Sequence, residues 1–288
     1  MSNGVGQTGE RVIVQGSGMH VLRRGTDGPR LVFLSGHGTA CPTLDFKPLW
    51  SRLIDRFRVI VVERPGYGWS DPVRRPRDVD VMMAETRQVL STLGEQGPYV
   101  LVAHSMAGLE ALRWAQTHPG EIRAVIGLDP CIPENVRKPG LATGGFLRVM
   151  HLVCRIGLTR LMSVEDTKRM FPLLAGDVLT AGEKKQYMDA VHRSSFSGPM
   201  IQEVGWLQRN ARKVASAPVP TRTPVCLFVT RGPGKECPDW QENLSIYVRQ
   251  FQRGKCVHLD CGHYVHYERA EQIADAMAAF LEQWMEDE

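Results

Sequence analysis

Short apolar runs alternate with longer segments of helical periodicity along most of this chain. Two alternating segments, at 11–15 and 19–25, flank a glycine-rich turn and predict an antiparallel hairpin. Six continuous apolar runs follow, at 31–34, 58–63, 99–103, 124–128, 224–229 and 255–259. Continuous runs of this length are typical of strands buried on both faces, as in parallel sheets.

Helical periodicity fills most of the intervals between these runs. It covers four segments, 45–56, 79–93, 106–117 and 270–285. Strand and helix patterns that alternate in this way predict an α/β fold with a doubly wound, mostly parallel sheet and helices on both faces.

One interval, between residues 128 and 224, breaks the alternation. It spans about 90 residues without a strand pattern and holds helical pieces at 145–156, 163–173, 180–193 and 197–213. An unstructured loop of this length is implausible. Two interpretations remain: a second small domain, or a helical cap inserted above the carboxyl edge of the sheet, where ligands bind in open α/β folds. The cap interpretation gives a core at 1–133, a cap at 134–217 and the rest of the core at 218–288.

Composition narrows the class of protein. The chain has 288 residues, 43% hydrophobic and 23% charged, with a net charge of +4, which is ordinary for a globular protein. The arginine pairs at 23–24 and 74–75 are isolated, so no nucleic-acid partner is expected. We expect a cytoplasmic protein without a membrane partner, because no secretory signal or long apolar run is visible. Seven scattered cysteines favour free thiols in a reducing compartment.

The segment at 99–115 carries the clearest chemical signal. Its apolar run ends at His104, Ser105 and Met106, and an amphipathic helix follows with the small residues Ala107 and Gly108 in its first turn. A sharp turn from strand to helix exposes the serine hydroxyl and points the helix N-terminus at the atom it attacks. The pattern predicts Ser105 as a nucleophile.

A serine nucleophile needs a base, an acid that orients the base, and an oxyanion hole. The candidate base is His263, which follows a glycine between the last apolar run and the final helical segment. His104 and His266 are expected to pack around the site. The spacing of Cys261, His263 and His266 matches no usual zinc pattern, so no metal or other cofactor is expected.

Five segments together resemble a known family. They are SGHGT at 35–39, VVERPGYGWSD at 61–71, AHSMAG at 103–108, GLDPCIP at 127–133 and CGHYVHYERAEQIADAMAAFL at 261–281. The chain resembles a serine hydrolase of the α/β-hydrolase fold, of the capped esterase type. The resemblance implies this fold, Ser105 as nucleophile and His263 as base, in the chain order that the family uses.

The resemblance leaves the acid open. Most of the family carries it after the penultimate strand, where this chain offers Glu236 and Asp239 without the usual Gly-x-x-Asp pattern. A minority, including the haloalkane dehalogenases, carries it one strand earlier, where Asp129 stands. Asp129 is the preferred candidate, and Asp239 and Glu236 are the alternatives.

The oxyanion hole needs two backbone amides. One is expected from Met106, directly after the nucleophile. The other comes from the SGHGT loop, whose register is ambiguous. If residues 35–36 take the place of the His-Gly pair of the family, the donor is His37; if residues 37–38 do, the donor is Thr39. The strand length favours His37.

These residues predict a cofactor-independent serine hydrolase that cleaves a carboxylic ester or a related small acyl substrate through an acyl-enzyme. Serine at the elbow argues against haloalkane dehalogenase and epoxide hydrolase chemistry, since those relatives use aspartate there. A C–C bond hydrolase or an aminopeptidase remains possible, with Glu203 as a candidate amine site. The rival of another class is a receptor that keeps the triad but works by binding a small molecule. The oligomeric state is left open.

Overall fold

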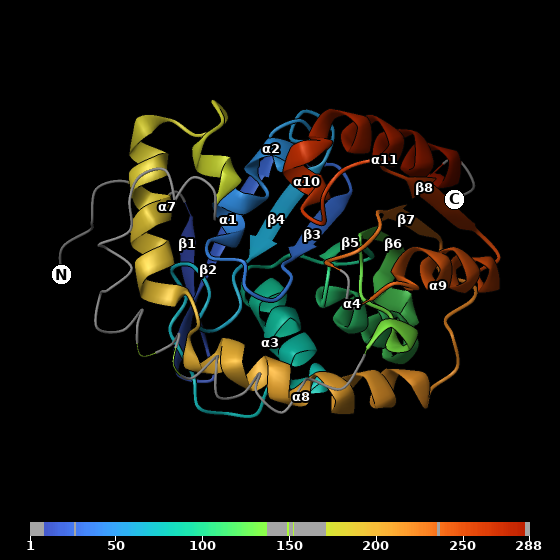
Figure 1. The fold of residues 1–288 in the computed structure, drawn as a ribbon, viewed down its shortest axis with the longest axis horizontal. Helices are drawn as coiled ribbons and strands as arrows, with labels where there is room; N and C mark the ends of the chain where they lie inside the picture. The colour runs from blue at the N-terminus through green and yellow to red at the C-terminus, as the bar shows by residue number, and fades with distance from the viewer. Residues whose placement is uncertain are drawn as a thin grey trace.

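The computed structural model describes residues 9–25, 27–136, 149, 152, 171–234 and 237–285. This part of the chain contains one sheet, in the order β1-β2-β4-β3-β5-β6-β7-β8 (Figure 1). The strands are β1 (Glu10–Val14), β2 (Ser17–Gly25), β3 (Arg30–Leu34), β4 (Arg58–Val62), β5 (Tyr99–His104), β6 (Ile122–Leu128), β7 (Val225–Val229) and β8 (Gly254–His258). β1 and β2 form the antiparallel hairpin, β2 pairs antiparallel with β4, and the pairs from β4 to β8 are parallel. The predicted strands are all confirmed.

Helices cover both faces of the sheet, as the alternation predicts. The larger ones flanking the sheet are α3 (Val79–Thr92), α4 (Ala107–Thr117), α9 (Trp240–Tyr247) and α11 (Ala270–Met285). α3, α4 and α9 share one apolar core with the inner strands, whereas α11 and the short α2 (Lys47–Trp50) share the core on the other face. Short elements complete these connections: α1 (Pro42–Asp45), α10 (Val265–Glu268), η1 (Pro119–Glu121), η2 (Pro133–Asn135) and η5 (Val248–Gln250). The fold is therefore the doubly wound α/β arrangement.

Two details of the prediction are wrong. The helix expected at 45–56 is two short helices, α1 and α2, followed by turns. Pro48 in the second of them has no amide to continue a helical hydrogen-bond ladder. β8 is the last strand of the sheet, and its residues are exposed or half-buried rather than buried on both faces.

The insertion between β6 and β7 is described in part. The expected helix at 145–156 and most of that at 163–173 lie outside the described residues. The other two are confirmed as α7 (Ala181–Ser194) and α8 (Gly198–Ala215), preceded by the short η4 (Pro172–Leu174). α7 packs against the loop that follows β3, and α8 packs on α4. The domain boundaries at 134 and 217 stay a prediction.

Helix length and hydropathy bear on the membrane question. Within residues whose structure is described, no helix is both long and apolar enough to cross a bilayer.

Candidate active site

The turn between β5 and α4 holds Ser105 in a strained conformation. Its φ of 51° lies in the left-handed region that non-glycine residues rarely adopt. The Ser105 carbonyl oxygen accepts hydrogen bonds from the Gly108 amide at 2.9 Å and from the Cys131 amide at 2.7 Å. These two bonds fix the turn, so that the serine hydroxyl is held at the end of the strand.

Two glycines let neighbouring backbone approach this turn. A Cβ on Gly108 would lie 2.4 Å from the Cys131 carbonyl oxygen, which is a collision with backbone. A Cβ on Gly36 would lie 2.7 Å from the Cβ of Ser105 and 2.7 Å from Nδ1 of His104. The loop after β3 therefore packs directly on the serine turn through Gly36, and any larger residue at either position would push the site apart.

His263 connects Ser105 to Asp129. It lies in the loop between β8 and α10. Its Nε2 is 2.9 Å from Oγ of Ser105, and its Nδ1 is 2.6 Å from Oδ2 of Asp129. Because a carboxylate only accepts, Nδ1 carries the proton and Nε2 is free to accept from the serine hydroxyl. The structure thus brings together the predicted nucleophile, the predicted base and the preferred acid.

The other two acid candidates do not join this arrangement. Asp239 is exposed to solvent and directly precedes α9, and Glu236 lies outside the described residues. The loop that usually supplies the acid instead supplies partners for Asp129: Nε1 of Trp240 donates to Oδ1 at 2.9 Å. The amide and the hydroxyl of Thr230 donate to the same carboxylate at 2.9 and 2.7 Å.

Asp129 is buried yet held in its charged form. Burial alone would raise the pKa of its carboxyl group, but the hydrogen bond and charge of His263 and the two bonds from Thr230 outweigh burial and lower it. Like Ser105, Asp129 has a positive φ, of 47°. No local pattern predicts Thr230 and Trp240 as partners, because both come from segments about 100 residues away in the chain.

The two neighbouring histidines are buried, as expected. Nε2 of His104 donates to the carbonyl oxygen of His263 at 3.1 Å, which anchors the loop that carries the base. The His266 ring packs 4.6 Å from that of His104 and 4.7 Å from that of Phe46, measured between ring centroids. Burial lowers the pKa of His104 well below its usual range and that of His266 to about 3. Both rings are therefore neutral near pH 7.

Two backbone amides beside Ser105 are available to a ligand. Within the described part of the chain, the amides of Met106 and His37 donate to no other group. Gly36 contacts the serine turn, so the amide that follows it is close to the nucleophile. The amide of Thr39, the alternative donor, likewise donates to no other described group, and its hydroxyl donates to the Gly36 carbonyl oxygen at 3.2 Å.

Glu203, the candidate amine site, is already neutralised by the protein. It is fully buried in α8, and its carboxylate accepts from Nη2 of Arg64 at 3.2 Å and from the Tyr67 hydroxyl. Nε of Arg77 lies 3.5 Å from its other oxygen, and Arg64 also pairs with buried Glu110 at 3.5 Å. Because two guanidinium groups already pair with this buried carboxylate, it is not available to a substrate amine. The proposal of Glu203 as an amine-binding residue is therefore wrong.

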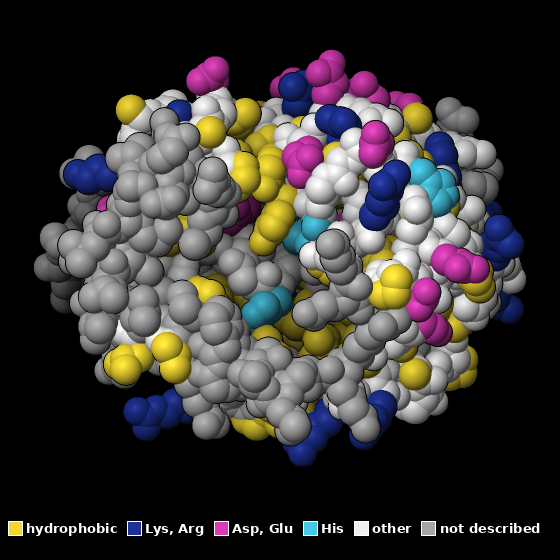
Figure 2. Space-filling model, in the orientation of Figure 1, with side chains coloured by type: hydrophobic (Ala, Val, Ile, Leu, Met, Phe, Trp, Pro, Cys, Tyr) yellow, Lys and Arg dark blue, Asp and Glu magenta, His cyan; other side chains and the backbone are white. Residues whose placement is uncertain are grey.

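The space-filling view is hollowed near its centre, where hydrophobic and histidine side chains are visible (Figure 2). In the described ranges, no three His, Cys, Asp or Glu side chains gather in a way that could hold a metal ion. What the described residues offer a reactant is therefore the serine, the histidine and the two amides.

Comparison with known proteins identifies the family. Residues 31–276 match the model of the alpha/beta hydrolase family, and the chain belongs to that family. Uncharacterized protein YbdG of Bacillus subtilis is 29% identical over 95% of this chain and 85% of its own. Two solved structures share the fold at 17% identity. The haloalkane dehalogenase DbeA from Bradyrhizobium elkani has a TM-score of 0.70, covering 97% of this chain and 99% of that one. The enol-lactonase from Burkholderia xenovorans has a TM-score of 0.69, covering 94% and 99%.

Proposed function

We propose that this protein is a serine hydrolase that cleaves a carboxylic ester or a related small acyl substrate through an acyl-enzyme. The observation that carries this proposal is the continuous hydrogen-bonded chain from Oγ of Ser105 through the His263 ring to Asp129. Serine at the elbow separates this site from the aspartate-dependent members of the fold. The described residues supply a nucleophile and a base, so the reaction needs no cofactor.

The reaction follows from the geometry. Nε2 of His263 takes the hydroxyl proton of Ser105 as Oγ bonds to the substrate carbonyl carbon. The carbonyl oxygen becomes an oxyanion, which the amides of Met106 and His37 stabilise. The tetrahedral adduct collapses when His263 gives its proton to the leaving alcohol, which leaves an acyl group on Ser105. Water then bonds to the acyl carbon as His263 takes one of its protons, and this second adduct collapses when His263 gives that proton to Oγ of Ser105, which releases the carboxylic acid.

Asp129 acts through His263 in both halves of the reaction. Its carboxylate accepts a hydrogen bond from Nδ1–H and stabilises the imidazolium each time that His263 holds two protons. Its three other hydrogen bonds keep it charged and oriented. Gly36 favours His37 over Thr39 as the second oxyanion donor, because the loop contacts the serine turn at Gly36 and the next amide is that of His37.

The substrate we propose is a small molecule rather than a nucleic acid or a membrane lipid. Thirty-five basic and 31 acidic side chains nearly balance over the chain, so no strong basic surface is expected. A cytoplasmic location fits the scattered cysteines. Among the described cysteines, Cys41, Cys131, Cys226, Cys256 and Cys261 are free thiols.

The test is active-site labelling with a fluorophosphonate probe, followed by peptide mapping. We expect one adduct, on Ser105, in the native protein and none in heat-denatured protein or in Ser105→Ala. Hydrolysis of p-nitrophenyl esters of increasing acyl length should then be lost in both Ser105→Ala and His263→Ala, with little change in the thermal midpoint. Absence of the adduct, or labelling without turnover of any ester alongside tight binding of one ligand, would overturn the proposal and favour the receptor.

A further inference from the structure

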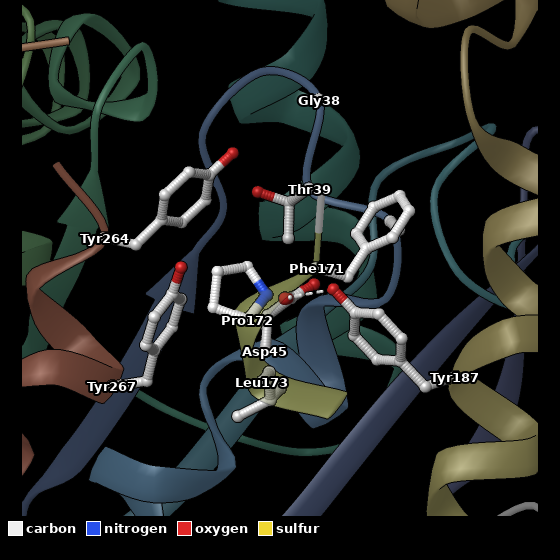
Figure 3. Close-up of a pocket in the computed structure, with 10 residues that line it drawn as sticks. Gly38, Thr39, Asp45, Phe171, Pro172, Leu173, Tyr187, Tyr264 and Tyr267 are labelled. Carbon is white, nitrogen blue, oxygen red and sulfur yellow. Dashed lines mark hydrogen bonds between the residues drawn. The ribbon is translucent and has the colours of Figure 1, made fainter. Parts of the chain in front are cut away.

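A cavity is lined in part by the loop that carries the proposed oxyanion donor. It contains about 350 Å³ of empty space, part of which is open to solvent, and its walls come from four parts of the chain. The residues that matter here are loop residues 38–40, Asp45, Phe171, Tyr187, Tyr264 and Tyr267. In Figure 3, Tyr264 and Tyr267 stand on one side, Phe171 and Tyr187 on the other, and the Asp45 carboxyl group lies between them.

This cavity, the tyrosine pocket, is lined by residues that are next to the proposed catalytic residues along the chain. Residues 38–40 directly follow His37, and Tyr264 directly follows His263. The rings of Tyr264 and His263 are 6.0 Å apart, centroid to centroid. Two walls of the tyrosine pocket are therefore formed by chain segments that directly follow the proposed oxyanion donor and the proposed base.

Asp45 is the unusual group in this pocket. It is only 3% exposed, and it accepts from the Tyr187 hydroxyl at 2.8 Å and from the Cys41 amide at 3.0 Å. No basic side chain of the described residues lies within 4.0 Å of it. Of the other buried carboxylates in the described structure, Glu85, Glu95, Glu110 and Glu203 pair with arginine, and Glu63 and Asp129 pair with histidine.

The absence of a basic side chain near Asp45 in the described structure favours the neutral form of its carboxyl group. A carboxylate buried without a cation is costly, and burial, together with nearby Glu63, raises the pKa of Asp45 to about 7. Two hydrogen bonds leave part of the capacity of its oxygens unused. A positively charged ligand in the pocket would supply the partner that the protein omits.

The aromatic side chains around Asp45 suit the same ligand. The rings of Tyr264 and Tyr267 stack at 5.6 Å, and those of Phe171 and Tyr187 meet edge to face at 5.9 Å. Aromatic faces attract ammonium groups, and a set of them with one acid is a familiar receptor for a quaternary or protonated amine. A neutral apolar group would gain from the rings but would leave Asp45 unmatched.

We propose that the tyrosine pocket binds an ammonium group of the substrate, through Asp45 and the surrounding rings, so that the hydrolase acts on esters that carry a positive charge near the scissile bond. This inference rests on the proposed function for its catalytic part only. Binding of the cation itself does not depend on Ser105.

The first test compares two esters of the same acid that differ in charge but hardly in shape. Butyrylcholine carries a quaternary ammonium group, and 3,3-dimethylbutyl butyrate carries a carbon in its place. We expect kcat/KM to be at least about tenfold higher for the choline ester. Asp45→Asn should reduce that ratio about tenfold or more, and Tyr267→Leu should reduce it less. Asp275→Asn, the same change at an exposed position of α11, is the matched control and should preserve the ratio.

The second test measures binding without catalysis. Titration calorimetry of Ser105→Ala with choline should show binding that its neutral analogue 3,3-dimethylbutanol does not match, and that the double variant Ser105→Ala, Asp45→Asn loses. The thermal midpoint of each variant shows that it is folded. Equal ratios for the two esters in wild type and Asp45→Asn, or equal binding of the two alcohols, would overturn the pocket proposal. Failure of both esters with selective choline binding intact would instead refute the proposed function and leave the cation site standing.

Discussion

Two buried carboxyl groups, those of Asp129 and Asp45, flank the candidate active site, and their pKa values are shifted in opposite directions. Asp129 is fully buried and receives three hydrogen bonds from Thr230 and Trp240 in addition to that of His263, so its pKa is lowered. Asp45, almost as deeply buried, receives two hydrogen bonds and no cation, and its pKa is raised to about 7. Depth is nearly the same, so the partners decide the charge. Asp129 has a full set of hydrogen-bond donors from the protein and serves the proposed catalysis. Asp45 has fewer donors and lines a cavity, so its oxygens can still accept from a ligand.

The sharpest test of the first half of this comparison is Asp129→Asn. An amide in this place can orient its NH2 group toward Nδ1 and favour the wrong tautomer of His263, so kcat should fall by about 10⁴-fold. The measurement is ester hydrolysis by purified variant and wild type, with the thermal midpoint as a check on folding. Asp239→Asn, at the exposed position that the family usually favours, should stay within a few-fold of wild type. A large loss of kcat in Asp239→Asn, with Asp129→Asn close to wild type, would show that Asp239 rather than Asp129 is the acid.

A third buried carboxylate, Glu203, tests whether pairing by the protein has energetic consequences. Glu203→Gln leaves Arg64 and Arg77 with less compensation in a fully buried place. Breaking one partner of such an arrangement costs about 3–5 kcal/mol, which should lower the thermal midpoint by roughly 10 °C. Glu271→Gln is the matched control, since its pair with Arg52 is exposed, and it should change the unfolding free energy by less than about 1 kcal/mol. Equal effects of the two substitutions would show that the buried cluster is not a stabilising unit.

Sequence patterns predicted the strands, the flanking helices and the serine turn, because each of these depends on residues that are near one another in the chain. The position of Asp129 was predicted from the place of the strand end in the family. Its donors were not, because Thr230 and Trp240 reach it only after β6 and β7 pair. A local sequence pattern cannot predict a hydrogen bond between residues that are far apart in the chain.

The Asp45 region shows the same limit more strongly. Its segment carries helical periodicity, and the expected single helix hid the break before Pro48. Nothing in that pattern marks Asp45 as buried, since its burial depends on Tyr187, which lies 142 residues further along the chain. Glu203 was noticed as an acid, but its arginine partners come from the loops after β4 and before α3. Long-range packing decides which acid is neutralised and which faces a cavity.

The second half of the comparison predicts an unusual pH dependence. Because folding raises the pKa of Asp45 from about 4 to about 7, the folded state holds a proton that the unfolded state loses. The stability from this group is therefore complete below about pH 4 and is lost as the pH rises through about 7. The upper limit of this loss is about 4 kcal/mol. Asp45→Asn, which cannot ionise, should show a flatter unfolding free energy between pH 5 and 8 than wild type, measured by urea denaturation. Parallel curves for the two proteins would mean that Asp45 titrates normally.

The smallest expected effect concerns the hydroxyl group that Tyr187 gives to Asp45. Tyr187→Phe removes one hydrogen bond, which should cost about 1 kcal/mol at pH 5, where Asp45 is neutral. At pH 8 the carboxyl group is mostly ionised, and a hydrogen bond to a charged acceptor contributes about 1.5–3 kcal/mol, so the cost should grow with pH. Urea denaturation at the two pH values measures both numbers.

Tyr267→Phe provides the control for this last prediction. Its ring lines the same pocket, but its hydroxyl group makes no hydrogen bond to any residue that the structure describes. Its unfolding free energy should therefore stay close to that of wild type at both pH values. A cost of Tyr187→Phe that is the same at pH 5 and pH 8 would mean that Asp45 does not change its charge over this range. The contrast with Asp129 would then reduce to a difference in hydrogen-bond number alone, and the pocket would lose the charge that makes an ammonium group its best ligand.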